Sequence, residues 1–220
     1  MQWKNDKELF ALIRKHLFSS IVGDVLDLHG RHHQFLPAPC RPLSPAMVVV
    51  GRAMTVLEND VDEIPDPPFG KMLEALDSMQ EDEVYLAAGC PPRYALWGEL
   101  MATAAKRRGA AGAVLAGYAR DTSGILKLEF PTFCYGSYGQ DQRGRGHVVA
   151  YREPLTIEGV LVHPGDILVG DVDGVVVLPR ELEVSVITQA LEQALKENTA
   201  RTMLENGALA VDVFTRTGVL

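Results

Sequence analysis

Six short apolar segments, separated by turn-forming residues, fill the stretch between residues 132 and 178. Runs of three to five residues, rich in valine, leucine and isoleucine and bounded by glycine, proline or aspartate, are typical of short β-strands. This part of the chain therefore predicts a small β-barrel or β-sandwich. The expected strands are Thr132–Gly136, Val148–Tyr151, Leu155–Ile157, Val160–Val162, Ile167–Asp171 and Val175–Leu178.

Strands and helices are expected to alternate in the segment that precedes this β-rich region. Apolar runs predict buried strands, and stretches of good helix formers predict the helices between them. The segment Glu58–Gly70 holds five acidic residues and three prolines, so we expect an exposed loop or lid there. The expected elements are strands over Ala46–Val56, Val84–Ala88 and Ala111–Gly117, and helices over Lys71–Met79 and Leu100–Arg108.

Both ends of the chain are expected to be helical. Apolar residues at helical spacing predict a two-piece helical arm over about residues 5–30 and a long helix over about residues 180–206. A chain of 220 residues with 47% hydrophobic residues can bury one core. The sequence thus predicts a single α/β domain over residues 1–220, with a mixed β core and helices on its outside.

The charge balance excludes several classes of function. Lys and Arg total 21 against 29 Asp and Glu, a formal net charge of −8, so we expect neither a nucleic-acid-binding surface nor one for anionic lipid. No apolar run approaches the roughly 20 residues of a membrane-spanning helix. The charged start shows no secretory signal, and three cysteines without CxxC spacing suggest reduced thiols. We therefore expect a cytoplasmic protein that acts on a small molecule.

The residues of greatest chemical interest are Glu99, Arg120 and Asp121. Glu99 is at the start of a predicted helix, and Arg120 and Asp121 follow the next predicted strand, so these three can converge on one cleft. The backbone N–H groups of a helix amino end attract anions, Arg120 can add a bidentate contact, and Asp121 offers an oxygen ligand for Mg²⁺ or Mn²⁺. From the residues alone, an Arg–Asp pair after a strand is more often a structural ion pair or a turn than a functional site.

The spacing of these residues resembles that of a known family. Twenty residues separate Glu99 from Arg120, and this acidic-x20-Arg-Asp pattern is similar to that of the class II pyruvate aldolases, which are the 4-hydroxy-4-methyl-2-oxoglutarate aldolases and their RraA-like relatives. Three further segments carry the resemblance, which thus covers most of the chain. They are SSIVGDVLDLHG at 19–30, PLSPAMVVVGRAMTV at 42–56 and VHPGDILVGDVDGVVVLPRE at 162–181.

The resemblance implies a fold and a mechanism. The fold is similar to the swivelling phosphohistidine domain, and the function is a divalent-metal-dependent lyase that cleaves a carbon–carbon bond of a small 2-oxo acid through a pyruvate enolate. Such an aldolase would also decarboxylate oxaloacetate. By analogy Asp121 holds Mg²⁺ or Mn²⁺ directly, Glu99 holds it through water, and Arg120 binds substrate oxygens. The backbone that receives the pyruvyl carboxylate is that of Gly98, Glu99, Leu100 and Met101.

The resemblance also implies an assembly. Family members form homotrimers or homohexamers, with the active site at a subunit interface. We therefore expect further copies of this chain as partners, beside the small 2-oxo acid substrate.

Two positions depart from the family pattern. Gly124 replaces an acidic residue that would hold a second water on the metal, and Glu99 stands where characterised aldolases often have aspartate. The glycine-rich loop with Asp141, Arg143 and Arg145 either selects an acidic substrate tail or is a solvated hairpin.

Two other functions fit a chain of this family. A non-enzymatic regulator, like the regulator of ribonuclease E activity, shares the fold but typically lacks the metal aspartate, which is present here as Asp121. A metal lyase or hydratase for a sugar-derived acid would use the same metal site with a different distal pocket.

Overall fold

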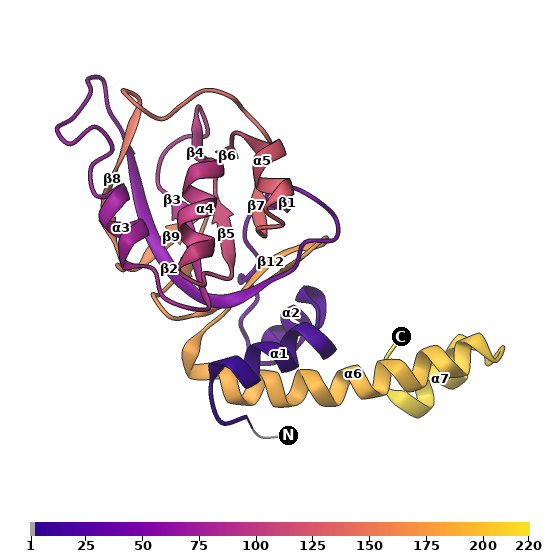
Figure 1. Cartoon of the computed structure of the whole chain (residues 1–220). Coiled ribbons are helices and arrows are strands. Elements are labelled where there is room, and N and C mark those ends of the chain that lie inside the picture. The colour runs from indigo at the N-terminus through magenta and orange to yellow at the C-terminus, as the bar shows by residue number, and fades with distance from the viewer. Residues whose placement is uncertain (1–2) are drawn as a thin grey trace.

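One mixed β-sheet organises the molecule, for which a computed structural model describes residues 3–220 (Figure 1). Its strand order is β1-β7-β5-β3-β2-β11-β12, and β8 pairs with the long strand β2 outside this path. The strands are β1 Arg41–Pro42, β2 Val49–Asp60, β3 Glu83–Ala88, β5 Gly112–Leu115, β7 Thr132–Cys134, β8 Gly146–Tyr151, β11 Ile167–Asp171 and β12 Gly174–Leu178.

The sheet has a parallel part and an antiparallel part. Strands β2, β3, β5 and β7 are parallel neighbours, and helices cross over between them on one side of the sheet (Figure 1). Strand β2 also pairs antiparallel with β11 and β8, and β11 with β12. Parallel strands require such crossover connections, whereas antiparallel strands can be joined by tight turns. The crossover helices are α3 Met72–Ser78, α4 Glu99–Arg107 and α5 Thr122–Lys127.

The two ends of the sheet approach each other, so the sheet is nearly a barrel. Strand β1 at one end contacts β11 and β12 at the other. Gly170 of β11 fits tightly at this closure, because a Cβ atom there would lie 2.8 Å from Val49 Cγ1 and 3.1 Å from Phe133. Apolar side chains fill the interior. The hairpin of β9, Leu155–Ile157, and β10, Val160–Val162, packs into the same cluster.

Four helices from the chain ends pack on the side of β11 and β12 or extend beyond it. They are α1 Asp6–His16, α2 Ser19–Leu28, α6 Glu183–Glu205 and α7 Ala210–Thr217. The Arg52 guanidinium of β2 joins two of them, since it donates to Asp6 of α1 at 2.6 Å and to Glu183 of α6 at 2.6 Å. The distal part of α6 projects past the body, and α7 folds back along it (Figure 1).

The predicted class, an α/β fold with a mixed β core and flanking helices, is confirmed. Three short strands, β9, β10 and β11, have the predicted bounds. The strands after residue 132 do not form a separate barrel, because β8, β11 and β12 pair with the earlier strand β2 or with one another. The C-terminal helix begins with a 3-10 turn at Arg180–Leu182 before α6. The sequence patterns missed α5, α7 and the short strands β4, Ala95–Trp97, and β6, Tyr118–Ala119.

Two simpler expectations concern cysteines and membranes. Cys40, Cys90 and Cys134 are free and buried. Among residues 3–220, no helix combines the length and the apolar character needed to cross a bilayer.

The predicted loop at residues 58–70 is wrong at its start. Strand β2 continues to Asp60 because it pairs with β8, where Glu58 faces Val148. The Glu58 side chain is completely buried, and among residues 3–220 neither of its carboxyl oxygens has a hydrogen-bond partner. Burial raises the pKa of Glu58 to about 8. A local excess of acidic residues and prolines indicates exposure, but it carries no information on a partner strand 90 residues later in the chain.

Glu58 should make the stability of the fold dependent on pH. The folded-state pKa of Glu58 lies above the ordinary value of 4.5. The protonated side chain therefore contributes fully to folding stability below about pH 4.5, and this contribution is lost as the pH rises toward 8. The difference in unfolding free energy between Glu58→Met and the wild type should therefore shift in favour of the variant from pH 5 to pH 8, by on the order of a few kcal/mol. Denaturant unfolding at both pH values measures this, with the exposed Glu192→Met as control. A gap that is the same at both pH values would contradict the assignment.

Candidate functional site

Two short parallel strands bring the predicted site residues together. Strand β4 ends at Trp97 and β6 ends at Ala119, and the Arg120 N–H donates to the Trp97 carbonyl at 2.8 Å. Gly98 and Arg120 are therefore neighbours, although 21 positions separate them in the chain. The sequence pattern placed Arg120 just after the strand predicted at residues 111–117, which is β5 in the structure. Arg120 instead directly follows the additional short strand β6.

Gly98 opens helix α4 and leaves the helix amino end accessible. It is the N-cap residue in an extended conformation, and no side chain caps the helix. The first N–H groups of an α-helix have no acceptor within the helix. The N–H groups of Glu99, Leu100 and Met101 therefore form the place where an anion would bind, helped by the positive end of the helix dipole. Leu100 is 83% exposed.

Asp121 has a left-handed backbone conformation, and its carboxylate does not cap its own helix. It is the N-cap residue of α5, with φ 54° and ψ 35°, yet its side chain makes no capping hydrogen bond. Aspartate at an N-cap usually accepts from the helix amides. Instead, Asp121 Oδ2 lies near Gly98, where a Cβ atom would be 3.1 Å from it. The carboxylate is thus available at the α4 amino end.

Glu99 occupies the space that Gly124 leaves open. A Cβ atom at Gly124 would lie 2.2 Å from both Cδ and Oε2 of Glu99, so the glutamate side chain extends over the first turn of α5. Glu99 and Gly124, the two positions that depart from the family pattern, are therefore in contact. The longer side chain at position 99 reaches the position where the family pattern has its second acidic residue.

Arg120 is held between two carboxylates. Its Nε is 3.4 Å from Asp121 Oδ2, and its Nη1 is 3.3 Å from Asp141 Oδ1. Asp141 reaches the site because its loop pairs with β4, where the Ala95 N–H donates to the Gln140 carbonyl at 2.8 Å. All three charged side chains remain partly exposed, with 36% to 44% of their area accessible, so a ligand can reach them.

The loop residues Arg143 and Arg145 lie elsewhere. Arg145 Nη1 donates to the carbonyls of Asp141 and Arg143 at 3.3 Å and 3.2 Å. Arg145 lines a separate hollow beside Asp60 and Arg93, and Arg143 is exposed. Of the three loop residues considered for substrate selection, Asp141 alone faces the site.

A cavity of about 380 Å³ opens beside Arg120, Asp121 and Asp141. Helix α3 and Phe69, three residues before its start, form one wall, and β4 with α4 forms the other. The sequence patterns missed this contribution of α3, because no local signal indicates which helices pack together. The apolar wall residues are Phe69, Met72, Leu73, Leu76, Ala95, Leu96, Trp97, Leu100, Met101 and Ala104.

The oxygen donors at this site suit a hard divalent cation. Among residues 3–220 there is no cluster of three or more His, Cys, Asp or Glu side chains, so a fully protein-coordinated site is absent from this part of the chain. Mg²⁺ is commonly held by one or two carboxylates, with water and substrate as the other ligands. Asp121 and Glu99 at the α4–α5 junction fit that pattern.

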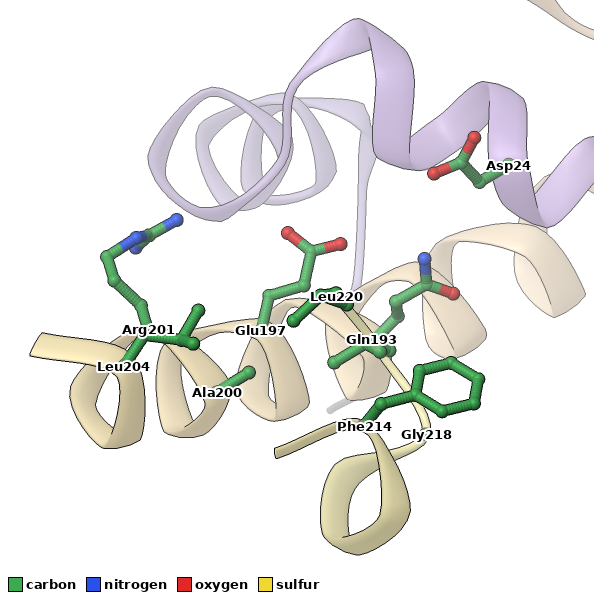
Figure 2. A pocket seen from close by; sticks show the side chains of 10 residues that line it. Asp24, Gln193, Glu197, Ala200, Arg201, Leu204, Phe214, Gly218 and Leu220 are labelled. Atoms are coloured by element: carbon green, nitrogen blue, oxygen red, sulfur yellow. The ribbon is translucent and has the colours of Figure 1, made fainter. Parts of the chain in front are cut away.

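A larger hollow of about 510 Å³ lies between α2, α6 and α7 (Figure 2). The side chains that line it include Asp24, Gln193, Glu197 and Phe214. It lies away from α4 and α5 (Figure 1), and none of the predicted site residues lines it.

Comparison with known proteins places the chain in a family. A protein of Halalkalibacterium halodurans, provisionally named 4-hydroxy-4-methyl-2-oxoglutarate aldolase, is 29% identical over 185 residues, which is 81% of this chain and 82% of that protein. Protein DlpA of Legionella pneumophila is 28% identical over 195 residues, 86% of this chain, and the match covers 31% of DlpA. The chain thus spans less than a third of that relative.

Structural comparison agrees at the level of the fold. Streptomyces coelicolor RraAS2, described as an unusual member of the RNase ES inhibitor RraA protein family, superposes with a TM-score of 0.79 at 24% identity, covering 91% of this chain and 99% of that one. The family model described as RraA-like (Aldolase/RraA) matches residues 19–177, which include all the site residues described above. The resemblance seen in the motifs is confirmed, and the chain belongs to the RraA-like (Aldolase/RraA) family.

Proposed function

We propose that this protein is a divalent-metal-dependent lyase that cleaves a carbon–carbon bond of a small 2-oxo acid through a pyruvate enolate. The observation that carries the proposal is the Asp121 carboxylate, which does not cap its own helix and lies beside the uncapped amino end of α4. A structural ion pair would not require the left-handed conformation of Asp121, which is uncommon for residues other than glycine.

The chain's own groups would bind the common part of the substrate. The carboxylate of the pyruvyl group accepts hydrogen bonds from the N–H groups of Glu99, Leu100 and Met101, beside Gly98. The Arg120 guanidinium lies on the other side of this position and donates to substrate oxygens. Asp141 and Asp121 fix the orientation of Arg120 before substrate arrives.

Asp121 would hold Mg²⁺ or Mn²⁺ directly, and Glu99 would hold it through water. When bound, the cation supplies a Lewis acid beside the 2-oxo group. The contact between Glu99 and Gly124 supports this arrangement, because it places the glutamate carboxyl at the α4–α5 junction.

The reaction breaks the bond between C3 and C4 of a 4-hydroxy-2-oxo acid. The 4-hydroxyl proton passes through water to the Glu99 carboxylate, C4 becomes a carbonyl carbon, and the electron pair of the broken bond enters the enolate of pyruvate. Arg120 stabilises the negative charge that develops on the enolate oxygen. The enolate then takes this proton at C3, from Glu99 through water, which restores the carboxylate. Oxaloacetate would lose carbon dioxide to give the same enolate.

The assembly expected from the family fits the site. We include in the proposal a homotrimer or homohexamer with the site at a subunit boundary. Leu73 and Leu100, which are 59% and 83% exposed, lie beside the cavity and would be partly covered by a neighbouring copy.

Replacing the metal aspartate should remove activity. Asp121→Asn should lower Mg²⁺-stimulated pyruvate release from oxaloacetate or a 4-hydroxy-2-oxo acid by on the order of 10²–10³-fold, as for other groups that stabilise developing charge. A coupled pyruvate assay, run with Mg²⁺ and with chelator, measures this. The matched control is Asp173→Asn, in an exposed turn. Undiminished turnover by the Asp121 variant would refute the assignment and favour a non-enzymatic role.

Adding one methyl group at Gly124 should displace the Glu99 carboxyl. Gly124→Ala places a Cβ atom where Glu99 Cδ now lies, so the glutamate must move away. The Mg²⁺ concentration for half-maximal activity should rise about tenfold or more, since outer-shell partners contribute that much to metal affinity. Gly139→Ala, at a position with open space, is the control. An unchanged Mg²⁺ requirement would show that Glu99 does not help to hold the metal.

A further inference from the structure

The cavity beside Arg120 limits what the substrate carries beyond its pyruvyl part. Resting on the proposed function, we infer that the substrate is a 4-hydroxy-2-oxo acid whose C4 substituent is uncharged and largely apolar, so that the second product is an alkyl or aryl aldehyde or ketone. The cavity of about 380 Å³ is within the size range of small-molecule sites. It begins at the charged residues and continues between α3 and α4.

The walls of the cavity are apolar beyond its charged end. Three apolar side chains of α3 face three of α4 across the cavity. They are Met72, Leu73 and Leu76 on α3, and Leu100, Met101 and Ala104 on α4. The uncharged polar side chain in the wall, Gln142, is buried, and its amide Nε2 lies 3.3 Å from Met72 Sδ. Burial of an apolar substituent against such walls is favourable, by about 0.8 kcal/mol for each methylene.

The charges at the cavity disfavour a second carboxylate. Among residues 3–220, Arg120 is the one cationic side chain that lines the cavity, and it is already shared between Asp121 and Asp141. A carboxylate on C4 would lie between the apolar walls, beyond Arg120 and the cation proposed for Asp121, where no other cationic side chain of residues 3–220 lines the cavity. Burial of an unpaired carboxylate is strongly unfavourable.

The arginines of the nearby loop do not change this balance. Arg145 donates to backbone carbonyls of its own loop and lines another hollow, and Arg143 does not line the cavity. Neither loop arginine therefore lies at the cavity to bind an acidic substrate tail, which is the role that the sequence suggested for them.

A substrate series tests the inference. Pyruvate release would be measured with Mg²⁺ for 4-hydroxy-2-oxo acids with hydrogen, methyl, ethyl and propyl groups on C4, and for 4-hydroxy-2-oxoglutarate, with a carboxylate on C4. The expected result is a two- to fourfold rise in kcat/KM for each added methylene, corresponding to about 0.8 kcal/mol at its upper limit, and at least tenfold weaker use of the dicarboxylate. Equal or better use of the dicarboxylate would overturn the inference.

Variants of the wall localise the effect. Ala104→Leu fills part of the cavity and should abolish the gain in kcat/KM with chain length. Leu73→Arg should reverse the preference toward the dicarboxylate. The control Leu161→Arg adds the same charge at a similarly exposed leucine on β10, away from the cavity. A preference that persists in both wall variants would overturn the assignment of the cavity.

Oxaloacetate separates this inference from the proposed function. It contains the pyruvyl part and loses only carbon dioxide, so it makes no use of the apolar walls. Turnover of oxaloacetate with no turnover of the alkyl-substituted acids would refute the inference and leave the lyase intact. Failure of the folded protein to release pyruvate from any of these compounds would overturn both. Light scattering of each variant checks that the assembly is unchanged.

Discussion

The pairing of β4 with β6 is the constraint on which the site depends. Each strand is only two or three residues long, but the hydrogen bond from the Arg120 N–H to the Trp97 carbonyl fixes the end of one beside the end of the other. The helix that starts at Gly98 and the helix that starts after Asp121 therefore begin at the same place. The bridge between Ala95 and Asp141 then adds the loop that orients Arg120.

The local chemistry at this junction is consistent across several residues. Gly98 has no side chain that would separate Asp121 from the amino end of α4, and Gly124 leaves room for the longer side chain of Glu99. Asp121 adopts a left-handed conformation that a carboxylate used only as a helix cap would not need. These features together favour a site for a cation and a 2-oxo acid over an isolated ion pair.

The sequence predicted the class of fold and most strands, because apolar periodicity and turn residues are local signals. The spacing of Glu99, Arg120 and Asp121 also predicted a site, and the structure brings Arg120 and Asp121 beside Gly98 at the start of α4. The sequence did not predict that Glu58 is buried, because that depends on the distant strand β8. It also gave no indication of the apolar wall from Leu73 and its neighbours, since the packing of α3 against α4 is a tertiary contact. The contact of Glu99 with Gly124 explains two departures that seemed independent in the sequence.

We propose that the metal and the 2-oxo acid bind at one place, between α4 and Asp121. Calorimetric titration of pyruvate into the protein, with Mg²⁺ and with chelator, tests it most directly. If a cation on Asp121 also contacts the 2-oxo acid bound beside Arg120, each ligand strengthens the binding of the other, and such coupling is typically 5- to 150-fold. Pyruvate should therefore bind more tightly with Mg²⁺ than with chelator, by about this factor. Equal affinity under both conditions would contradict it.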